Sequence, residues 1–278
     1  MDKIVLMLNY ARSGGTLLNK CLASLPDVVM LSEVNPLGGG SGSNPKVSTS
    51  TIKDQLKAWY SIDIKSNTFK GQIQELHNYC EQNNKNLIIR DWSFVNFSKF
   101  EKYNQNSPPN KFLILEELKD FDLKIFGFIR DSIDVWLSRG YYNVDEFYGE
   151  YVNYIDELIK VGCPIFKYED FVKHPQEQLK KIGEEVGVAF SNIFDTCLDY
   201  DKLNGDVQNK NKSRGIKQQQ IKILPRKKIN SEKITEINQC EKMKMVNAKF
   251  GYPVTYYNSF WKDTIIVPAK NFIKRIVR

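Results

Sequence analysis

The sequence predicts an α/β protein in three layers, with a mostly parallel central sheet between two layers of helices. Short apolar runs such as KIVLML at 3–8 and LKIFGFI at 123–129 alternate with segments of helical apolar spacing. Strands that are buried on both faces are continuous apolar runs, and parallel neighbours are joined by helical crossovers. With 278 residues, 41% of them hydrophobic, the chain can bury one large core.

The expected elements alternate along the chain. Strands are predicted at 3–8, 28–31, 86–90, 123–129 and 164–167. Helices are predicted at 16–25, 53–60, 69–83, from about 132, 146–161 and 175–186. The segment 36–50, PLGGGSGSNPKVSTS, has the composition of a loop, and the C-terminal part is expected to be basic and mainly helical.

Composition argues against a membrane-spanning protein and against a metal site. A quarter of the residues are charged, and no apolar run approaches the roughly 20 residues of a membrane span. The five scattered cysteines and two histidines show no metal-ligand spacing, so reduced cysteines and a site without metal are expected. The chain opens on a strand pattern with no signal peptide, which gives the cytoplasm as the expected location.

Positive charge is concentrated in the C-terminal part. Residues 202–278 hold 18 Lys and Arg against 5 Asp and Glu, whereas residues 1–201 hold 22 against 28. Such a region suits an anionic ligand or surface, although a solvated lysine-rich face would give the same count.

The strongest chemical signal is the segment RSGGT, between the first predicted strand and the first helix. Gly14 and Gly15 let the backbone approach an anion closely, and the N–H groups of the helix N-terminus point toward it. Arg12 adds a full charge and Thr16 a hydroxyl group. The GxxxxGK[ST] loop of nucleoside triphosphatases does not fit, because its first glycine and its lysine are absent. The pattern predicts a phosphate-binding loop of another kind.

Four segments occur in an order and spacing that resemble the sulfotransferase family. They are YARSGGTLLNKCLASLPDVVMLSE at 10–33, FGFIRDSIDVWLSRG at 126–140, PIFKYEDFVKHPQEQLKKIGEEVGV at 164–188 and AKFGYP at 248–253. The first resembles the 5′-phosphosulfate loop of the tyrosylprotein and bacterial branch, and the second resembles the 3′-phosphate segment. The third and fourth resemble a strand–helix unit and the closing helix end of that family.

The resemblance implies a transferase whose co-substrate is 3′-phosphoadenosine 5′-phosphosulfate (PAPS), with no metal. The two anionic ends of this donor need separate cationic groups. The resemblance assigns the 5′ end to Arg12, Ser13, Gly14, Gly15, Thr16 and Leu17, and the 3′-phosphate to Arg130 and Ser138. An ion pair of Arg130 with Asp131 or Asp134 is the alternative for that arginine.

Two further donor contacts follow from the resemblance. Tyr168 stands at the position of a cofactor-contacting tyrosine of the tyrosylprotein branch, and a core tyrosine explains it nearly as well. Lys212, Ser213 and Arg214 lie where the family closes the nucleotide site with a basic loop, although the family pattern is not reproduced residue by residue.

A carboxylate near the donor would serve as general base. Glu33 follows Arg12 by 21 residues, just beyond the second predicted strand, which is the position of the base in the tyrosylprotein branch. The carboxyl ends of parallel strands share one edge with the anion loop, so Glu33 should face the sulfuryl group. Asp91 is the second candidate because it also follows a strand. Arg90 is expected to pair with Asp91, or else to orient the acceptor or assist the sulfate.

The acceptor cannot be read from the sequence. A hydroxyl group of a carbohydrate, a lipid or another small molecule is expected, and a nucleic-acid partner is not. Two alternative functions remain open: a nucleotide or small-molecule kinase, disfavoured by the missing loop lysine, and a non-catalytic protein that binds a nucleotide or an anionic surface.

The resemblance ends near Pro253, so a sulfotransferase domain is expected at 1–253 and a tail at 254–278. In the tail, apolar residues recur at helical spacing among Lys and Arg: Phe272, Ile273, Ile276 and Val277. Such a segment could lie on an anionic membrane surface or dock on the domain as a last helix.

Overall fold

The computed structural model describes residues 3–38, 51–99, 107–140, 143–189, 221 and 223–258. Their strands form one five-stranded sheet in the order β2-β3-β1-β4-β5. The strands are β1 Lys3–Asn9, β2 Val28–Val34, β3 Asn86–Asp91, β4 Asp122–Ile129 and β5 Ile165–Lys167. All four strand pairs are parallel, which confirms the predicted fold class.

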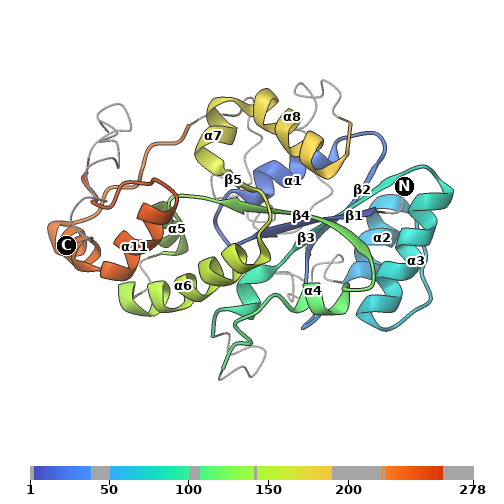
Figure 1. The fold of residues 1–278 in the computed structure, drawn as a ribbon, viewed down its shortest axis with the longest axis horizontal. Helices are drawn as coiled ribbons and strands as arrows, with labels where there is room; N and C mark the ends of the chain where they lie inside the picture. Colours follow the sequence, from blue (N-terminus) through green and yellow to red (C-terminus); the bar gives the residue numbers. More distant parts are fainter. Residues whose placement is uncertain are drawn as a thin grey trace.

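Helices connect and cover the strands (Figure 1). They are α1 Gly15–Ala23, α2 Ile52–Tyr60, α3 Phe69–Gln82, the 3-10 helix η1 Ser93–Asn96, α4 Leu113–Glu117, α5 Ser132–Arg139, α6 Val144–Val161, α7 Tyr168–Lys173, α8 Pro175–Val186, α10 Ser231–Gln239 and α11 Glu241–Lys249. Within the described residues, every strand and helix predicted by its range is present, with ends shifted by a few residues. η1, α4 and α7 have no counterpart in the prediction, and α10 and α11 match only the expectation of a mainly helical C-terminal part.

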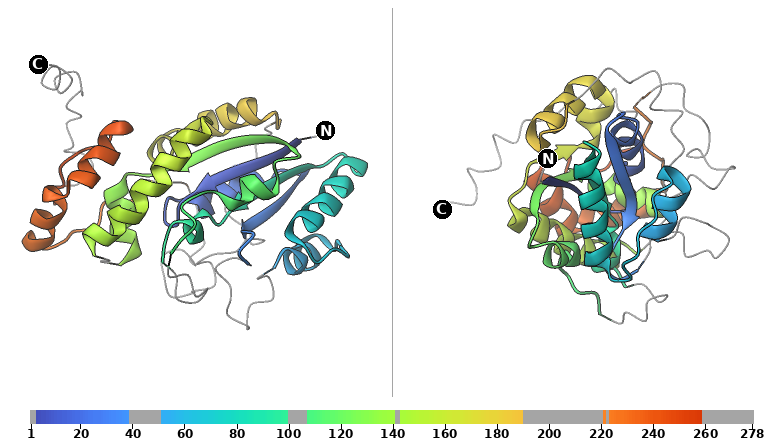
Figure 2. Two further views of the ribbon diagram at one scale, coloured as in Figure 1. Left: turned by 60° about the horizontal axis from the view of Figure 1, so that its bottom comes forward. Right: turned by 90° about the vertical axis from the view of Figure 1, so that its right-hand side faces the viewer.

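The sheet separates two apolar cores, as the alternation of its side chains requires. On one face, Val5 and Met7 of β1 pack with α1, α7 and α8. On the other face, Ile4, Leu6 and Leu8 pack with α2 to α6 and with the C-terminal helices. Figure 1 and Figure 2 show the resulting layers, with α10 and α11 at the end of α6 that is farther from the N-terminus.

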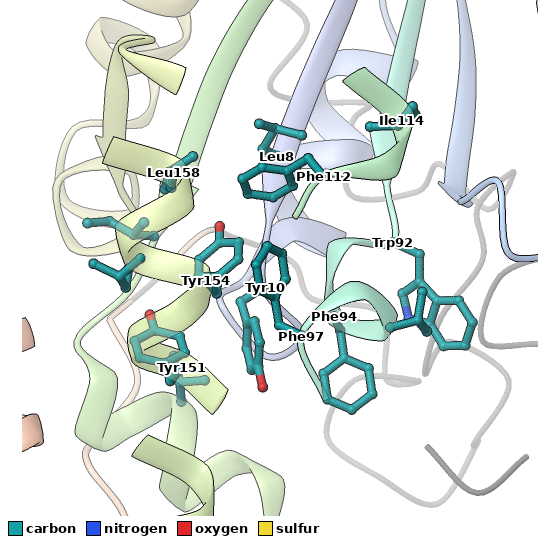
Figure 3. Packing of buried hydrophobic residues seen from close by; sticks show 14 of the residues in the cluster. Leu8, Tyr10, Trp92, Phe94, Phe97, Phe112, Ile114, Tyr151, Tyr154 and Leu158 are labelled. Carbon is teal, nitrogen blue, oxygen red and sulfur yellow. The ribbon is translucent and has the colours of Figure 1, made fainter. Parts of the chain in front are cut away.

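Tyr10, the residue after β1, is the centre of an aromatic cluster on the second face (Figure 3). Its ring lies edge-on to Phe94 of η1 at 5.5 Å and to Tyr151 of α6 at 5.0 Å between ring centroids. Its hydroxyl group lies 2.8 Å from the Ser98 hydroxyl group. Edge-on aromatic pairs are favourable beyond the area they bury. The start of the anion loop is therefore fixed against both η1 and α6.

The outer edge of β2 is covered by polar side chains of α2. The Gln55 amide accepts a hydrogen bond from Ser32 N at 2.8 Å and donates one to Ser32 O at 3.0 Å. The Tyr60 hydroxyl group likewise accepts from Met30 N and donates to Met30 O. These side chains thus take the place of a neighbouring strand along β2.

Several expectations fall on residues that the structure does not describe. They concern most of the 36–50 loop, Cys197, Lys212, Ser213 and Arg214, and the tail after residue 258. The other four cysteines are free thiols, three of them buried and Cys163 half-buried. Of the helices in the described ranges, none combines the length and the apolar character needed to cross a membrane.

The Gln55 contact predicts a loss of stability in Gln55→Leu, which keeps the side-chain volume and removes both hydrogen bonds to Ser32. We expect the free energy of unfolding in urea to fall by roughly 1–3 kcal/mol. Gln74→Leu, on the exposed side of α3, is the matched control. A change in Gln55→Leu no larger than in this control would show that the contact does not stabilise the edge.

Candidate functional site

The candidate site lies at the carboxyl edge of the sheet. All five strands run in the same direction, so the residues that end them or follow them meet at this edge. β1 ends at Asn9, β4 is followed by Arg130, and β5 is followed by Tyr168. Glu33 and Arg90 lie near the ends of β2 and β3. Most of the residues that the sequence singled out are thus brought to one edge.

The anion loop requires both of its glycines. Gly14 has φ +85°, and a Cβ atom there would lie 2.2 Å from the Tyr168 ring. A Cβ atom on Gly15 would lie 2.5 Å from the Asn9 amide. α1 begins at Gly15, and Leu17 N and Leu18 N donate to the carbonyl of the N-cap residue Gly14. The N–H groups of Gly15 and Thr16 are the ones left without a partner inside the helix, at its N-terminus. The loop therefore has the shape and the polarity of an anion cradle.

Arg12 connects the anion loop to the segment 126–140, which the resemblance assigns to the 3′-phosphate. Its Nε donates to Ser138 O at 3.0 Å and to Ser138 Oγ at 3.1 Å, across 126 residues of chain. Arg12 itself has φ 77°, a left-handed conformation that is uncommon for a residue with a side chain. The structure thus places Arg12 beside Ser138.

Arg12 lies in a crowded cationic region. Burial and then the neighbouring Arg139 and Arg130 lower the pKa of Arg12 to about 10, against the opposing effect of Glu33. Guanidinium groups that repel one another in a partly buried site favour a bound anion, since an anion compensates their charge.

Arg130 is placed by Tyr168. Its guanidinium carbon lies 4.7 Å from the centroid of the Tyr168 ring, which also lies against Gly14. Arg130 Nη2 lies 3.7 Å from Asp134 Oδ2, which is an ion pair beyond hydrogen-bond distance. Tyr168 is therefore both buried and part of the site wall, and the expected alternative of a pair between Arg130 and Asp134 is present in a loose form.

Arg90 connects three strand ends. It donates from Nε to Asn9 Oδ1 at 3.1 Å, from Nη1 to Thr16 Oγ1 at 3.4 Å and from Nη2 to Glu33 Oε1 at 2.7 Å. The Arg90 and Glu33 side chains are 4% and 11% exposed, so this is a nearly buried ion pair. The predicted pair between Arg90 and Asp91 is wrong, because the guanidinium points toward β1 and β2 instead.

Glu33 lies within β2 rather than beyond it, which corrects the predicted strand end. The register with β3 shifts between Ser32 and Val34, and Glu33 has φ 55°. Such a bulge changes the direction of the side chain at the extra residue. All seven residues of β2 are buried, and the bulge explains how the carboxylate of Glu33 can nevertheless reach Arg90.

Asp91 is enclosed in a separate polar cluster. Its carboxylate accepts from Asn35 Nδ2 at 2.9 Å and from Ser93 Oγ at 2.7 Å. Asn35 Nδ2 also donates to Asn96 Oδ1 at 2.8 Å. Burial raises the pKa of Asp91 from 3.8 to about 7, although these hydrogen bonds oppose the shift. Asp91 therefore joins the end of β3 to residues after β2 and to η1.

Sequence reasoning missed three residues of this region. Arg139 directly follows Ser138, and its guanidinium lies 4.2 Å from the centroid of the Phe94 ring. Arg226 forms ion pairs with Asp131 and Asp134, the two acidic residues after Arg130. Asn9 is fixed by Arg90 and covers Gly15. Arg139 could have been singled out because it follows Ser138, a residue predicted to bind the 3′-phosphate. Arg226 is one of many basic residues in its region and gave no such signal.

The residues present suit an anion better than a metal. Within the described part of the chain, no group of three or more His, Cys, Asp or Glu side chains is arranged to hold a metal ion. Ser13 Oγ and Arg130 Nε are buried donors that have no hydrogen-bond partner among the described residues. Buried donors are normally satisfied, so a phosphate or sulfate oxygen at this edge would complete them.

Two solved structures with a similar fold are sulfotransferase domains. The one from the Synechococcus PCC 7002 olefin synthase matches with a TM-score of 0.60 and 16% identity, over 90% of this chain and 95% of that domain. The one from the curacin biosynthetic pathway matches with a TM-score of 0.54 and 13% identity, over 91% of this chain and 99% of that domain. No protein-family model and no curated protein matches the sequence.

The chain therefore has the sulfotransferase fold along nearly its whole length. The family resemblance that four sequence segments indicated is confirmed at the level of the fold.

The burial of Asp91 predicts a pH dependence of stability. Below pH 3.8 the carboxyl group is protonated in both states. Between pH 3.8 and about 7 it is neutral only in the folded state, so its ionisation in the unfolded chain favours unfolding as pH rises. Over this whole pH range the loss of stability amounts to about 4 kcal/mol.

We measure the free energy of unfolding of wild type and Asp91→Asn at each pH. We expect the stability of Asp91→Asn relative to wild type to rise as the pH increases from 4 to 8. Asp27→Asn, at an exposed carboxylate before β2, is the control and should not change the pH dependence. Parallel curves for wild type and Asp91→Asn would show that this carboxyl group ionises freely in the folded protein.

Proposed function

We propose that this protein is a sulfotransferase that moves the sulfuryl group of PAPS to a hydroxyl group of a small-molecule, carbohydrate or lipid acceptor. The observation that carries the proposal is the bridge between two cationic segments, in which Arg12 of the anion loop donates to Ser138, eight residues after Arg130. A donor with a phosphosulfate at one end and a 3′-phosphate at the other needs such a pair of sites at a fixed separation.

The proposed donor contacts are those that the family resemblance implies, and the residues among them that the structure describes lie near one another at this edge. The 5′-phosphosulfate is held by Arg12, by the Ser13 hydroxyl group and by the loop from Gly14 to Leu17, at the N-terminus of α1. The 3′-phosphate is held by Arg130 and Ser138, with Tyr168 behind the guanidinium. Lys212, Ser213 and Arg214, which the structure does not describe, are proposed to close the nucleotide site.

Glu33 is the proposed general base. The acceptor oxygen attacks the sulfur atom while Glu33 takes the hydroxyl proton. The bond from sulfur to the 5′-phosphate oxygen breaks, and its electron pair leaves with 3′,5′-ADP. Arg12 and the helix N-terminus stabilise the negative charge that develops on the leaving nucleotide. No redox step or metal enters this balance.

Arg90 supports the choice of Glu33 over Asp91. Its guanidinium binds Glu33 and Thr16 together, which ties the carboxylate to the loop proposed to hold the sulfuryl group. Asp91, by contrast, is 1% exposed and enclosed by Asn35 and Ser93. A base must reach the acceptor proton, and the Asp91 cluster is built to hold the surrounding chain.

The first prediction of this proposal concerns donor binding. Arg12→Ala and Arg130→Ala each remove a charge-assisted contact of roughly 1.5–3 kcal/mol, so their affinity for 3′,5′-ADP should fall about tenfold to a hundredfold in isothermal titration. Lys180→Ala, on the exposed side of α8, removes the same charge away from the site and should bind like wild type. Wild-type affinity in both arginine variants would remove this site assignment.

The second prediction separates the two candidate bases. Glu33→Gln keeps the shape of the side chain and an oxygen for Arg90 but loses the proton acceptor. Its turnover with labelled PAPS should fall on the order of 10²–10⁴-fold, while 3′,5′-ADP binding stays near wild type. Asp91→Asn should retain turnover. The opposite pattern, with Asp91→Asn inactive and Glu33→Gln active, would make Asp91 the base.

Nucleotide titrations also test the class of reaction. Tighter binding of ATP with magnesium than of 3′,5′-ADP would contradict the sulfotransferase proposal and favour a kinase. Binding of 3′,5′-ADP without transfer to any member of an acceptor panel would favour a non-catalytic nucleotide-binding protein.

A further inference from the structure

The polar cluster behind Arg130 is formed by residues far apart in the chain. Arg226 Nε donates to Asp134 Oδ1 at 2.9 Å, and its Nη2 donates to Asp131 Oδ2. Asp131 and Asp134 are 1% and 3% exposed, and Arg226 is 11% exposed. Burial opposes the charge of Arg226, yet the two carboxylates outweigh it and raise the pKa of Arg226 above its ordinary value. A single guanidinium thus compensates two buried carboxylates.

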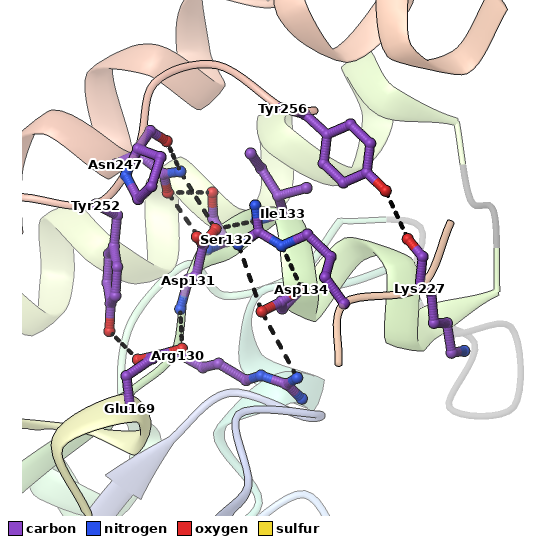
Figure 4. Close-up of polar contacts among 12 residues, drawn as sticks. Arg130, Asp131, Ser132, Ile133, Asp134, Glu169, Lys227, Asn247, Tyr252 and Tyr256 are labelled. Atoms are coloured by element: carbon purple, nitrogen blue, oxygen red, sulfur yellow. Dashed lines mark hydrogen bonds and ion pairs between the residues drawn. The ribbon is translucent and has the colours of Figure 1, made fainter. Parts of the chain in front are cut away.

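These two carboxylates flank the residue proposed to bind the 3′-phosphate. Asp131 is next to Arg130 in the chain, and Asp134 lies one helical turn further, where its Oδ2 is 3.7 Å from Arg130 Nη2 (Figure 4). Arg226 Nε takes the other oxygen of Asp134 at much shorter distance. Arg130 is therefore bound only loosely to Asp134 and stays over the Tyr168 ring.

The rest of the cluster holds these groups in place. Asp131 accepts from Ile133 N at 2.9 Å and so caps α5, and it also accepts from Asn247 Nδ2 of α11. Lys227 Nζ donates to Leu137 O near the other end of α5, and Lys227 O accepts from the buried Tyr256 hydroxyl group. Arg226 is consequently fixed by its neighbours, and Asp131 cannot turn away from it without losing the cap of α5.

We propose that Arg226 is a positioning residue that keeps Arg130 available for the 3′-phosphate by occupying Asp131 and Asp134. This inference rests on the proposed function. Without the Arg226 charge, the nearly buried Asp134 needs another cation, and Arg130 is already within 3.7 Å. Arg130 would then move from its place over Tyr168 into a tight pair along α5, and the nucleotide would lose its 3′-phosphate contact.

The test measures recognition of the 3′-phosphate separately from nucleotide binding in general. The affinities for 3′,5′-ADP and for 5′-AMP are measured by isothermal titration, and their ratio reports the contribution of the 3′-phosphate. The wild-type chain should prefer 3′,5′-ADP at least tenfold. Arg226→Met should lose tenfold or more of this preference, while its affinity for 5′-AMP changes less than about threefold.

A second substitution distinguishes positioning from general damage. Arg226→Met combined with Asp134→Asn removes the carboxylate that would capture Arg130, so this double variant should recover most of the preference. Arg226→Lys keeps the charge but not the bidentate geometry and should lose an intermediate share. It also serves as the test variant should Arg226→Met fail to fold.

The outcomes separate the two proposals. A wild-type chain without preference for 3′,5′-ADP contradicts the proposed function itself. A wild-type preference that persists in Arg226→Met, or in Arg226→Lys if only that variant folds, overturns the role of Arg226 alone. A loss in Arg226→Met that Asp134→Asn does not restore would also overturn it, since capture of Arg130 by Asp134 would then not be the cause.

Discussion

The buried pair of Arg90 and Glu33 is the interaction on which the site depends most. Arg90 comes from the strand between β1 and β2, and its guanidinium bonds to the end of β1, to Thr16 at the start of α1 and to Glu33. Breaking one partner of a buried pair leaves an uncompensated charge, which costs far more than a surface pair contributes. The pair thus fixes the anion loop and the carboxylate relative to each other through a single side chain.

Arg226 repeats this arrangement on the other side of the site. There the guanidinium comes from the C-terminal part and bonds to Asp131 and Asp134 behind Arg130. Tyr168 contacts both parts of the site, since its ring lies against Gly14 of the loop and under the Arg130 guanidinium. Both ends of the proposed donor site are therefore positioned by buried charge pairs, while the arginines proposed to touch the donor, Arg12 and Arg130, remain partly exposed.

The strands and most helices could be predicted because each carries a local pattern of apolar residues or a local breaker. The turn between β1 and α1 could be predicted for the same reason, since two adjacent glycines between a strand and a helix are a local signal. The partner of Arg90 could not be predicted. The choice between Asp91 and Glu33 depends on a bulge at Glu33, and no residue type in the sequence indicates this bulge. Arg226 was equally hidden, since only the tertiary fold brings it to residues more than ninety positions earlier.

The covering of β2 by α2 has a consequence for how the protein behaves in a crowded solution. An open sheet offers two edges on which a strand of another molecule can add, and such addition begins many aggregates. Here the β2 edge has its Met30 and Ser32 backbone groups already bonded to Tyr60 and Gln55. The opposite edge strand, β5, is only three residues long. Neither border of the sheet offers a long row of unpaired groups, so the described fold presents a poor template for intermolecular β-pairing.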